Sequence, residues 1–220
     1  MKPLLIFDMD GVLVDVTESY RESIAQTVVH FTGSKPTREQ IQDYKNQGGW
    51  NDDWRLSHHI ITQSGVDVSF EIVKDYFQSI FLGGLIFREQ WVARPGLLEA
   101  LNQQFDFALF TGRPLADAKL TLDRFADGIA FSPQIGMYEV TRHKPDPEGL
   151  LRIADAHDGP AYYVGDTVDD ARCARAAKIS FIGIAAPANP RYIDLVFLFQ
   201  AEGAYAIVDN INYLPEVFAL

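Results

Sequence analysis

The sequence predicts an α/β fold: a Rossmann-like, doubly wound parallel sheet with a small inserted α-helical domain. Short apolar runs alternate along the chain with stretches of helical spacing, which is typical of a parallel sheet covered by helices on both faces. The interval between the first two apolar runs is much longer than one helical crossover needs, and its helical spacing indicates the insert. The runs predicted as strands are residues 3–6, 106–110, 161–164, 181–184 and 206–208.

The first strand leads directly into two carboxylates, Asp8 and Asp10, followed by Gly11. Alternate residues of an extended chain point the same way, so both carboxylates can converge at the carboxyl edge of the sheet, where α/β folds bind ligands. Converging carboxylates repel each other unless a cation lies between them, and Mg²⁺ favours such oxygen sites. The pair predicts a magnesium site, although a solvated acidic turn gives the same local pattern.

The second strand supplies an anion site. Residues 106–110 lead into Thr111, Gly112 and Arg113, and Pro114 then opens a helix. A threonine hydroxyl and free backbone N–H groups at a helix N-terminus suit an anion of phosphate size. Arg113 is a further candidate for an anion contact, and pairing with Asp117 one turn on is its alternative role.

Two later segments add charge at the same edge. Lys144 lies ahead of a helix predicted at about 148–156, and the strand at 161–164 leads into Asp166, with Asp170 about one helical turn further on. Each group alone has an ordinary explanation, as a helix cap, a solvated lysine or a first-turn acid. Their order along the chain, each after a strand or before a helix, favours one shared site.

Together these segments resemble the four motifs of the haloacid dehalogenase-like hydrolase superfamily. The first motif matches Asp8–Gly11, the second Thr111–Arg113, the third Lys144-Pro145 and the fourth Gly165–Asp170. The resemblance covers most of the chain, and the match is specific because order, spacing and strand context agree. It implies the phosphatase branch whose α-helical cap follows the first motif (subfamily IA).

For this chain the resemblance implies an Mg²⁺-dependent phosphatase that acts on a small phosphorylated metabolite. Asp8 would form an aspartyl-phosphate, and Asp10 would be the general acid and base. Thr111 and Lys144 would hold the phosphoryl oxygens, and Asp166 would bind Mg²⁺ with support from Asp170. The full predicted set is catalytic Asp8 and Asp10, phosphate-binding Thr111, Gly112, Arg113 and Lys144, and metal-binding Asp8, Asp10, Asp166 and Asp170.

The residue types suit this chemistry without any appeal to kinship. A carboxylate attacks phosphorus only when the repulsion between the two anions is screened, which a metal and Lys144 can do. Asp10 would protonate the leaving oxygen and then deprotonate the attacking water. A haloacid has no leaving oxygen to protonate, so Asp10 argues against dehalogenation.

The spacing of the motifs also divides the chain. We predict a core formed by residues 1–15 and 91–220 and a cap at 16–90. Apolar residues recur at helical spacing from Tyr20 to Phe31, and Gly33 ends that helix. Further helices are predicted at 37–45, 54–63 and 68–81. The glycines at 83–84 and the segment at 94–96 mark the return to the core.

The most unusual cap segment runs from Gln47 to Trp54 and holds two glycines, two tryptophans and two acids. One interpretation is a helix start, with Asn51 as its cap. The other is a specificity loop in which Trp50, Asp52 and Asp53 meet the leaving group, where the acids would suit a polyol or an amine. The stretch resembles a superfamily subgroup associated with histidine biosynthesis, which makes histidinol phosphate one candidate among many.

Composition fits a soluble enzyme of the cytoplasm. The 220 residues carry 19 basic and 30 acidic side chains, a formal charge of −11, without a run of Lys or Arg. We therefore expect neither a nucleic acid nor a membrane as partner. The lone Cys173 excludes an internal disulfide and suits a reducing compartment as a packed thiol. We expect no signal peptide, because a strand begins at residue 3. The oligomeric state is open.

Two other classes of function use the same residues. A phosphomutase would need a cap with an extra cationic site for a bisphosphate, and the acidic segment around Asp52 speaks against that. A non-catalytic metabolite-binding protein on this scaffold would not need all the reactive groups, which are intact.

Overall fold

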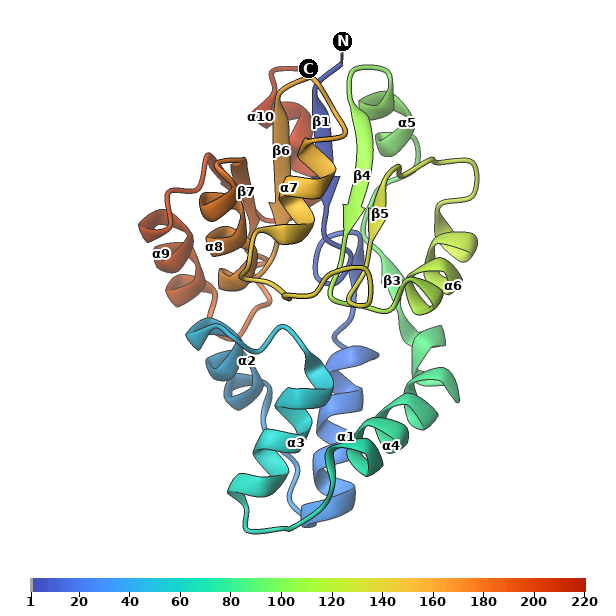
Figure 1. The fold of residues 1–220 in the computed structure, drawn as a ribbon, viewed down its shortest axis with the longest axis vertical. Helices are drawn as coiled ribbons and strands as arrows, with labels where there is room; N and C mark the ends of the chain where they lie inside the picture. Colours follow the sequence, from blue (N-terminus) through green and yellow to red (C-terminus); the bar gives the residue numbers. More distant parts are fainter. Residues whose placement is uncertain (1) are drawn as a thin grey trace.

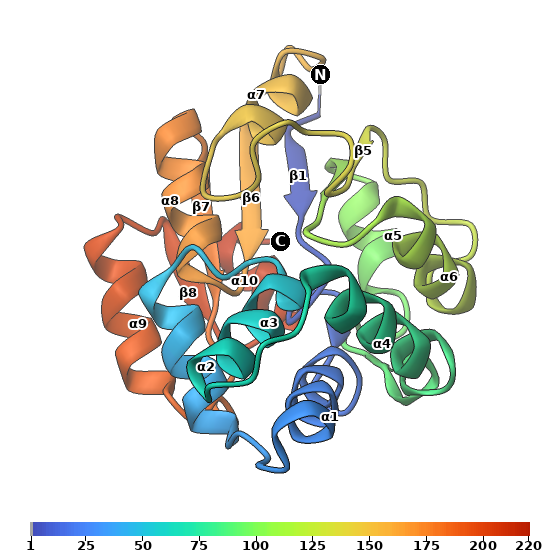
Figure 2. The same ribbon diagram turned by 60° about the horizontal axis from the view of Figure 1, so that its bottom comes forward.

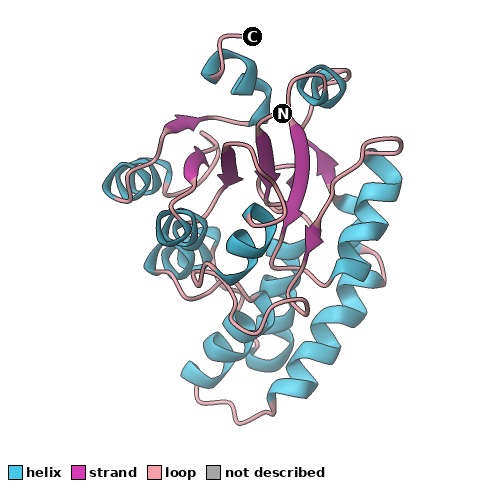
Figure 3. Cartoon of the chain, turned by 45° about the horizontal axis from the view of Figure 1, so that its top comes forward, coloured by secondary structure: helices cyan, strands magenta, loops and turns pink. Residues whose placement is uncertain are grey.

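The computed structural model describes residues 2–220 and has a parallel six-stranded sheet at its centre. All five strand pairs are parallel, in the order β5-β4-β1-β6-β7-β8 (Figures 1 and 3). The strands are β1 (Leu4–Phe7), β4 (Asp106–Phe110), β5 (Gln134–Ile135), β6 (Ala161–Gly165), β7 (Ser180–Ile184) and β8 (Ala206–Val208). The predicted doubly wound α/β class is confirmed.

Both faces of the sheet are buried, which explains why its strands are continuous apolar runs. Leu5 and Phe7 of β1 belong to one hydrophobic cluster, and Leu4 and Ile6 belong to another, as the two-residue period of a strand requires. The first cluster includes residues of α5 (Leu97–Asn102), α6 (Leu115–Phe125) and α10 (Leu214–Val217). The second includes residues of α7 (Glu148–Ala154), α8 (Val168–Ala177) and α9 (Tyr192–Ala201).

Four further helices form a layer below the carboxyl ends of the strands (Figures 1 and 2). We call them the helical layer: α1 (Tyr20–Thr32), α2 (Arg38–Gln47), α3 (Asp53–Gln63) and α4 (Phe70–Leu82). Helix α1 packs on both α3 and α4. Buried side chains such as Ile24, Val28, Phe77 and Phe81 hold the layer together, and they join the cluster on one face of the sheet. The layer therefore shares its core with the sheet.

Local signals set the ends of these helices close to where the sequence predicts them. Helix α1 stops at Gly33, whose φ of 72° is the left-handed conformation that glycine adopts freely. Helix α2 begins with a capping box between Thr37 and Gln40. Helix α3 begins at Asp52, whose side chain accepts hydrogen bonds from the backbone N–H groups of Trp54 and Arg55. The helix cap is thus Asp52, and the prediction of Asn51 was wrong.

Two short connections join the helical layer to the sheet. Strand β2 (Val14–Asp15) pairs antiparallel with β3 (Gln90–Trp91), so the outgoing and returning chains lie side by side. A 3₁₀ turn, η1 (Leu85–Arg88), leads into β3. The sequence analysis missed β2, β3 and β5, because a two-residue strand is too short to show an alternating pattern. A second 3₁₀ turn, η2, covers Ile211–Tyr213.

Within residues 2–220 no helix combines the length and apolar character that crossing a membrane requires. Cys173 lies on α8 and is fully buried, as predicted. Burial raises the pKa of the Cys173 thiol to about 12.

We expect Cys173 to resist thiol reagents in the folded protein, because only the thiolate is a strong nucleophile. At pH 8, labelling by Ellman's reagent should be about a thousandfold slower in the native protein than in concentrated urea, where a cysteine pKa is about 8.5. Absorbance stopped-flow measures both rates. Fast labelling of protein that keeps its native circular dichroism would contradict the buried position.

Candidate active site

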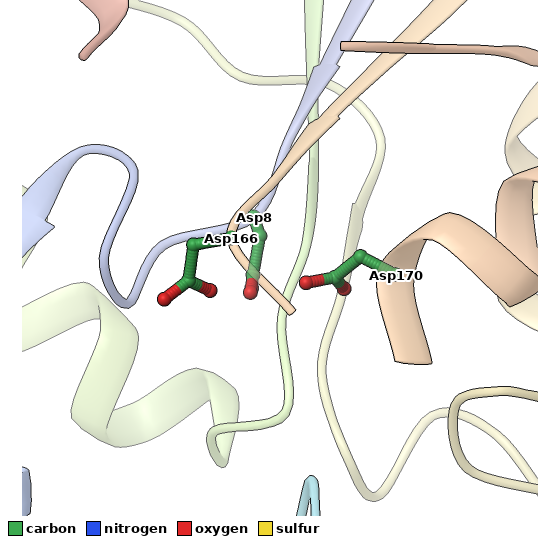
Figure 4. Close-up of side chains that lie close together, drawn as sticks. All are labelled: Asp8, Asp166 and Asp170. Atoms are coloured by element: carbon green, nitrogen blue, oxygen red, sulfur yellow. The ribbon is translucent and has the colours of Figure 1, made fainter. Parts of the chain in front are cut away.

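Three carboxylates meet at the carboxyl edge of the sheet. Asp8 follows β1, Asp166 follows β6, and Asp170 lies in the first turn of α8. One oxygen of each lies within 4.8 Å of the others, and Figure 4 shows Asp8 between Asp166 and Asp170. We call these three residues the acidic cluster. Strands that end side by side in a parallel sheet bring together residues far apart in the sequence, which explains the cluster.

Lys144 lies beside the cluster and is 4% exposed. Its Nζ lies 2.8 Å from Oδ1 of Asp170 and 3.1 Å from Oδ1 of Asp8. It also donates to the hydroxyl of Tyr163 at 2.8 Å, and that hydroxyl donates to Asp170 at 2.7 Å. The ammonium thus bridges the first and third carboxylates and cannot turn toward solvent without breaking several contacts.

One ammonium does not balance three carboxylates, two of them buried and that of Asp166 half-buried. Burial raises the pKa of Asp8 to about 7 even though Lys144 acts to lower it. Burial also raises the pKa of Asp166 well above its ordinary value, with Arg21 opposing and the neighbouring carboxylates adding to the effect. Burial disfavours the charged form of Asp170 as well, but Lys144 and hydrogen bonds from Thr167 and Tyr163 lower its pKa overall. The ionised cluster therefore needs additional positive charge.

Two glycines allow the carboxylates to approach so closely. A Cβ atom on Gly11 would lie 2.0 Å from Oδ2 of Asp166, and its φ of +72° disfavours other residues. A Cβ atom on Gly165 would lie 2.5 Å from the Cβ of Asp170. Any larger residue at either position would push one acid out of place.

Asp10 lies outside the acidic cluster, and its carboxylate pairs with Arg113. Nε of Arg113 donates to Oδ1 of Asp10 at 2.7 Å, and Nη2 contacts the same oxygen. Nη1 of Arg113 pairs with Glu89 at 2.8 Å. Asp117, the alternative partner from the sequence, instead accepts hydrogen bonds from Tyr20 and Gln78. The carboxylate of Asp10 is thus not placed with the metal-binding candidates, and the Arg113 side chain is occupied by two acids.

The residues predicted to bind an anion follow β4 at the same edge. Thr111 is buried, and its hydroxyl oxygen accepts a hydrogen bond from the backbone N–H of Arg113 at 3.2 Å. Accepting that bond leaves the hydroxyl proton of Thr111 for a ligand. Gly112 lies against the helical layer, because a Cβ atom there would be 2.5 Å from Nδ2 of Asn51.

A small cavity of about 30 Å³ lies between the sheet edge and the helical layer. This volume holds a few water molecules at most. The sheet edge contributes residues that include Asp8, Asp10, Gly112, Arg113 and Asp166. The helical layer contributes Tyr20, Arg21, Lys45, Asp53 and Trp54, and the connection before α3 contributes Asn51 and Asp52. The cavity thus brings the predicted catalytic residues face to face with the predicted specificity segment.

The acids of that segment are already paired. Asp52 caps α3, as described above. Asp53 contacts Lys45 and lies 3.3 Å from Nη1 of Arg21. Trp50 does not line the cavity: its ring packs against those of Tyr44 and His59. The helical layer therefore presents to the cavity two cations and a paired acid, whereas the specificity-loop interpretation of the sequence expected acids free to meet the leaving group.

Several residues of the site escaped the sequence analysis. Arg21, Glu89 and Tyr163 were not identified, because single polar residues in a helix, a linker and a strand carry no pattern. Lys45 also lies at the site: it is 4% exposed and donates to the carbonyl oxygen of Trp50 at 2.6 Å. Only the folded chain brings these groups to the cavity.

The chain is similar in sequence to a dehydratase and to a phosphatase. It is 34% identical over 197 residues to an imidazoleglycerol-phosphate dehydratase of Phytophthora nicotianae, a match that covers 83% of this chain and 43% of that protein. It thus spans less than half of that relative. It is 27% identical over 191 residues to a phosphoglycolate phosphatase of Pseudomonas fluorescens, covering 83% of this chain and 69% of that protein.

The fold is shared with solved structures. A conserved haloacid dehalogenase-like protein of Agrobacterium tumefaciens superimposes with a TM-score of 0.76 at 19% identity, covering 100% of this chain and 98% of that one. The sequence model of the haloacid dehalogenase-like hydrolases matches residues 5–184, which include all the motif residues from Asp8 to Asp170. The expected resemblance is confirmed, and the chain belongs to the haloacid dehalogenase-like hydrolase family.

Proposed function

We propose that this hydrolase is an Mg²⁺-dependent phosphatase that cleaves a small phosphorylated metabolite through an aspartyl-phosphate on Asp8. The observation that carries the proposal is the acidic cluster with the buried Lys144 beside it. A phosphate monoester is the class of substrate that needs a nucleophile, a metal and a fixed cation at one point. A cytoplasmic location suits the single cysteine.

The acidic cluster fits Mg²⁺ in charge and in chemistry. Oδ1 of Asp166 is buried and has no hydrogen-bond partner within residues 2–220, which suits a metal ligand. Asp8 and Asp166 would hold the ion through carboxylate oxygens, and Asp170 would support it from its pairing with Lys144. When bound, Mg²⁺ would supply the positive charge that the cluster lacks and would neutralise phosphoryl oxygens.

The chain's own residues can carry out both steps of hydrolysis. Oδ1 of Asp8 is held by the backbone N–H of Met9 and by Lys144, which leaves Oδ2 to attack phosphorus. Lys144 and the hydroxyl of Thr111 would bind phosphoryl oxygens, with backbone N–H groups near Gly112. Asp10 would give a proton to the leaving oxygen and then take one from the attacking water.

The helical layer would act as a cap, as residues 16–90 were predicted to do. The cavity of about 30 Å³ is small for an organic phosphate, so opening and closing of the layer would admit one and then cover it. Once closed, Arg21, Lys45 and Asp53 would contact the leaving group. Polyol, sugar and amino-alcohol phosphates are the candidate substrates.

The names of two relatives suggest which compounds to test first. By its name, one relative acts on imidazoleglycerol phosphate, which supports imidazole-bearing esters such as histidinol phosphate. By its name, the other acts on phosphoglycolate, whose leaving group is an alcohol that carries a carboxylate. A phosphate-release screen over phosphorylated polyols, sugars, amines and acids, with and without Mg²⁺, tests the proposal. No release from any ester, nitrophenyl phosphate included, would contradict it.

A phosphomutase on the same core is the second candidate. Arg21 and Lys45 line the cavity, and cations there suit the second phosphate of a bisphosphate. The same incubations decide between the two activities, because a hydrolase releases inorganic phosphate and a mutase converts one sugar phosphate into its isomer.

We expect Asp8→Asn to reduce phosphate release to background, because the amide keeps the shape but is no nucleophile. Asp10→Asn should lower kcat for alkyl phosphates by about 10²- to 10⁴-fold, the usual contribution of a general acid–base residue. The kcat for nitrophenyl phosphate should fall less, because its leaving group needs little protonation. Steady-state kinetics on both esters measures this, and Asp8→Asn activity within tenfold of wild type would exclude the aspartyl-phosphate.

We expect Asp166→Asn to weaken Mg²⁺ binding, since a hard carboxylate ligand becomes a neutral amide. Calorimetry and the Mg²⁺-dependent rise in melting temperature both report this. Asp169→Asn is the matched control, because the Asp169 carboxylate accepts from the backbone N–H of Gly49 and lies outside the acidic cluster. Equal Mg²⁺ affinity in the two variants would remove Asp166 from the metal site.

We expect Asp53→Asn to change substrate preference by about tenfold, the scale of one hydrogen bond to a charged group. The change leaves Arg21 and Lys45 without their acid, so kcat/KM should rise for esters with an anionic leaving group and fall for those with an amine. Asp52→Asn is the control, because asparagine also caps helices. If Asp53→Asn alters all substrates equally, Asp53 only stabilises the helical layer.

A further inference from the structure

Arg113 holds the carboxylate that the proposed mechanism uses as its acid and base. Nε and Nη2 of Arg113 both contact Oδ1 of Asp10, Nε at 2.7 Å. No hydrogen bond within residues 2–220 engages Oδ2 of Asp10, and the Asp10 side chain is 21% exposed whereas that of Arg113 is 1% exposed. The guanidinium thus engages Oδ1 of Asp10 and leaves Oδ2 for proton transfer.

Arg113 is itself fixed from every side. Its Nη1 pairs with Oε1 of Glu89 at 2.8 Å and donates to Thr121 at 3.1 Å. Its Cζ atom lies 4.5 Å from the ring centre of Tyr20 and 5.7 Å from that of Phe81. A guanidinium between two acids and two rings has no alternative rotamer that keeps these contacts.

The charges around Arg113 balance one another. Glu89 also contacts Arg124 and accepts a hydrogen bond from Thr121 at 2.8 Å. Two arginines thus face two carboxylates, Asp10 and Glu89. Burial acts against the charge on Arg113, but Asp10 and Glu89 more than compensate and raise its pKa. The guanidinium therefore stays charged, and none of its charge is reserved for a substrate phosphate.

Asp10 needs such a partner because its neighbours repel it. Asp8 lies two residues away, and Asp166 lies against Gly11, the residue next to Asp10. A partly exposed carboxylate next to other acids would otherwise turn into water. A general acid must hold its proton within hydrogen-bond distance of the leaving oxygen, so the orientation of Asp10 matters for the rate.

On the basis of the proposed phosphatase function, we propose that Arg113 is the positioning residue for Asp10 and that Glu89 anchors Arg113. Glu89 directly precedes β3, whose partner β2 follows the loop that carries Asp10. The group thus links the acid–base carboxylate to both connections between sheet and helical layer. This role replaces the phosphate contact expected for Arg113 from the sequence.

Arg113→Lys tests the role, because lysine keeps the charge but lacks the planar fork. We expect kcat for an alkyl phosphate to fall about 10- to 100-fold, part of the range of a general acid–base residue, with KM within about threefold of wild type. The kcat for nitrophenyl phosphate should fall much less. Arg124→Lys is the matched control. Arg124 also contacts Glu89 but does not contact Asp10, so this change should leave the ratio of alkyl to aryl activity unaltered.

A double-mutant cycle separates positioning from phosphate binding. If Arg113 acts through Asp10, adding Arg113→Lys to Asp10→Asn should cost less than about threefold further on nitrophenyl phosphate, because the two residues act as a unit. If Arg113 instead bound the substrate phosphate, Arg113→Lys would raise KM for both esters. Its loss of activity would then multiply with that of Asp10→Asn in the double variant. That result, or an equal loss on alkyl and aryl esters in Arg113→Lys alone, would overturn the positioning role.

Glu89→Gln tests the positioning role if the melting curve of Arg113→Lys shows that this variant does not fold. The amide keeps the shape of Glu89 and weakens the anchor of Arg113, so a smaller loss with the same alkyl selectivity is expected. Equal losses on alkyl and aryl esters in folded Glu89→Gln would contradict the proposal. Failure of the phosphatase function itself is distinguishable, since wild-type protein would then release no phosphate or Asp8→Asn would stay active.

Discussion

The excess of negative charge at the carboxyl edge of the sheet is the constraint on which the rest of the site depends. Asp8, Asp166 and Asp170 are brought together by the backbone, and Lys144 supplies one compensating charge. Burial and mutual repulsion raise the pKa of Asp8 and Asp166. Such a cluster favours its ionised form only with a further cation, and Mg²⁺ is the cation that we propose.

The site divides its charges into two separate groups. Lys144 neutralises the side of the proposed nucleophile, where it contacts Asp8 and Asp170. Arg113 neutralises the side of the proposed acid and base, where it contacts Asp10 and Glu89. Asp8 and Asp10 are two residues apart in the chain, yet each has its own buried cation from a distant segment. This separation allows neighbouring carboxylates to take different chemical roles.

The helical layer has its own charge balance. Asp53 is buried between Lys45 and Arg21, and Asp52 is used as a helix cap. A leaving group that enters the cavity therefore meets cations together with an acid that already has partners. The sequence alone suggested that an acidic loop would exclude an anionic leaving group, and this arrangement removes that objection. Substrates that carry a carboxylate or a second phosphate therefore belong among the compounds to test.

The sequence by itself determined most of the fold and the members of the reactive set. Apolar runs fixed five of the six sheet strands, helical spacing and Gly33 placed α1, and Asp8, Lys144 and Asp166 were recognisable because each stands beside a strand or helix end. These signals are local, since burial on both faces of a strand and the caps of a helix act on neighbouring residues.

Only the tertiary structure decided which charges are paired. Arg113 with Glu89, Lys45 with Asp53 and Tyr163 with Lys144 are contacts between segments that carry no common pattern. The energy of an ion pair depends on distance and burial in the folded chain, and neither can be read along a sequence. For that reason the sequence left two roles open for Asp53 and for Arg113, and only the fold showed that Asp53 pairs with Lys45 and Arg113 with Asp10 and Glu89.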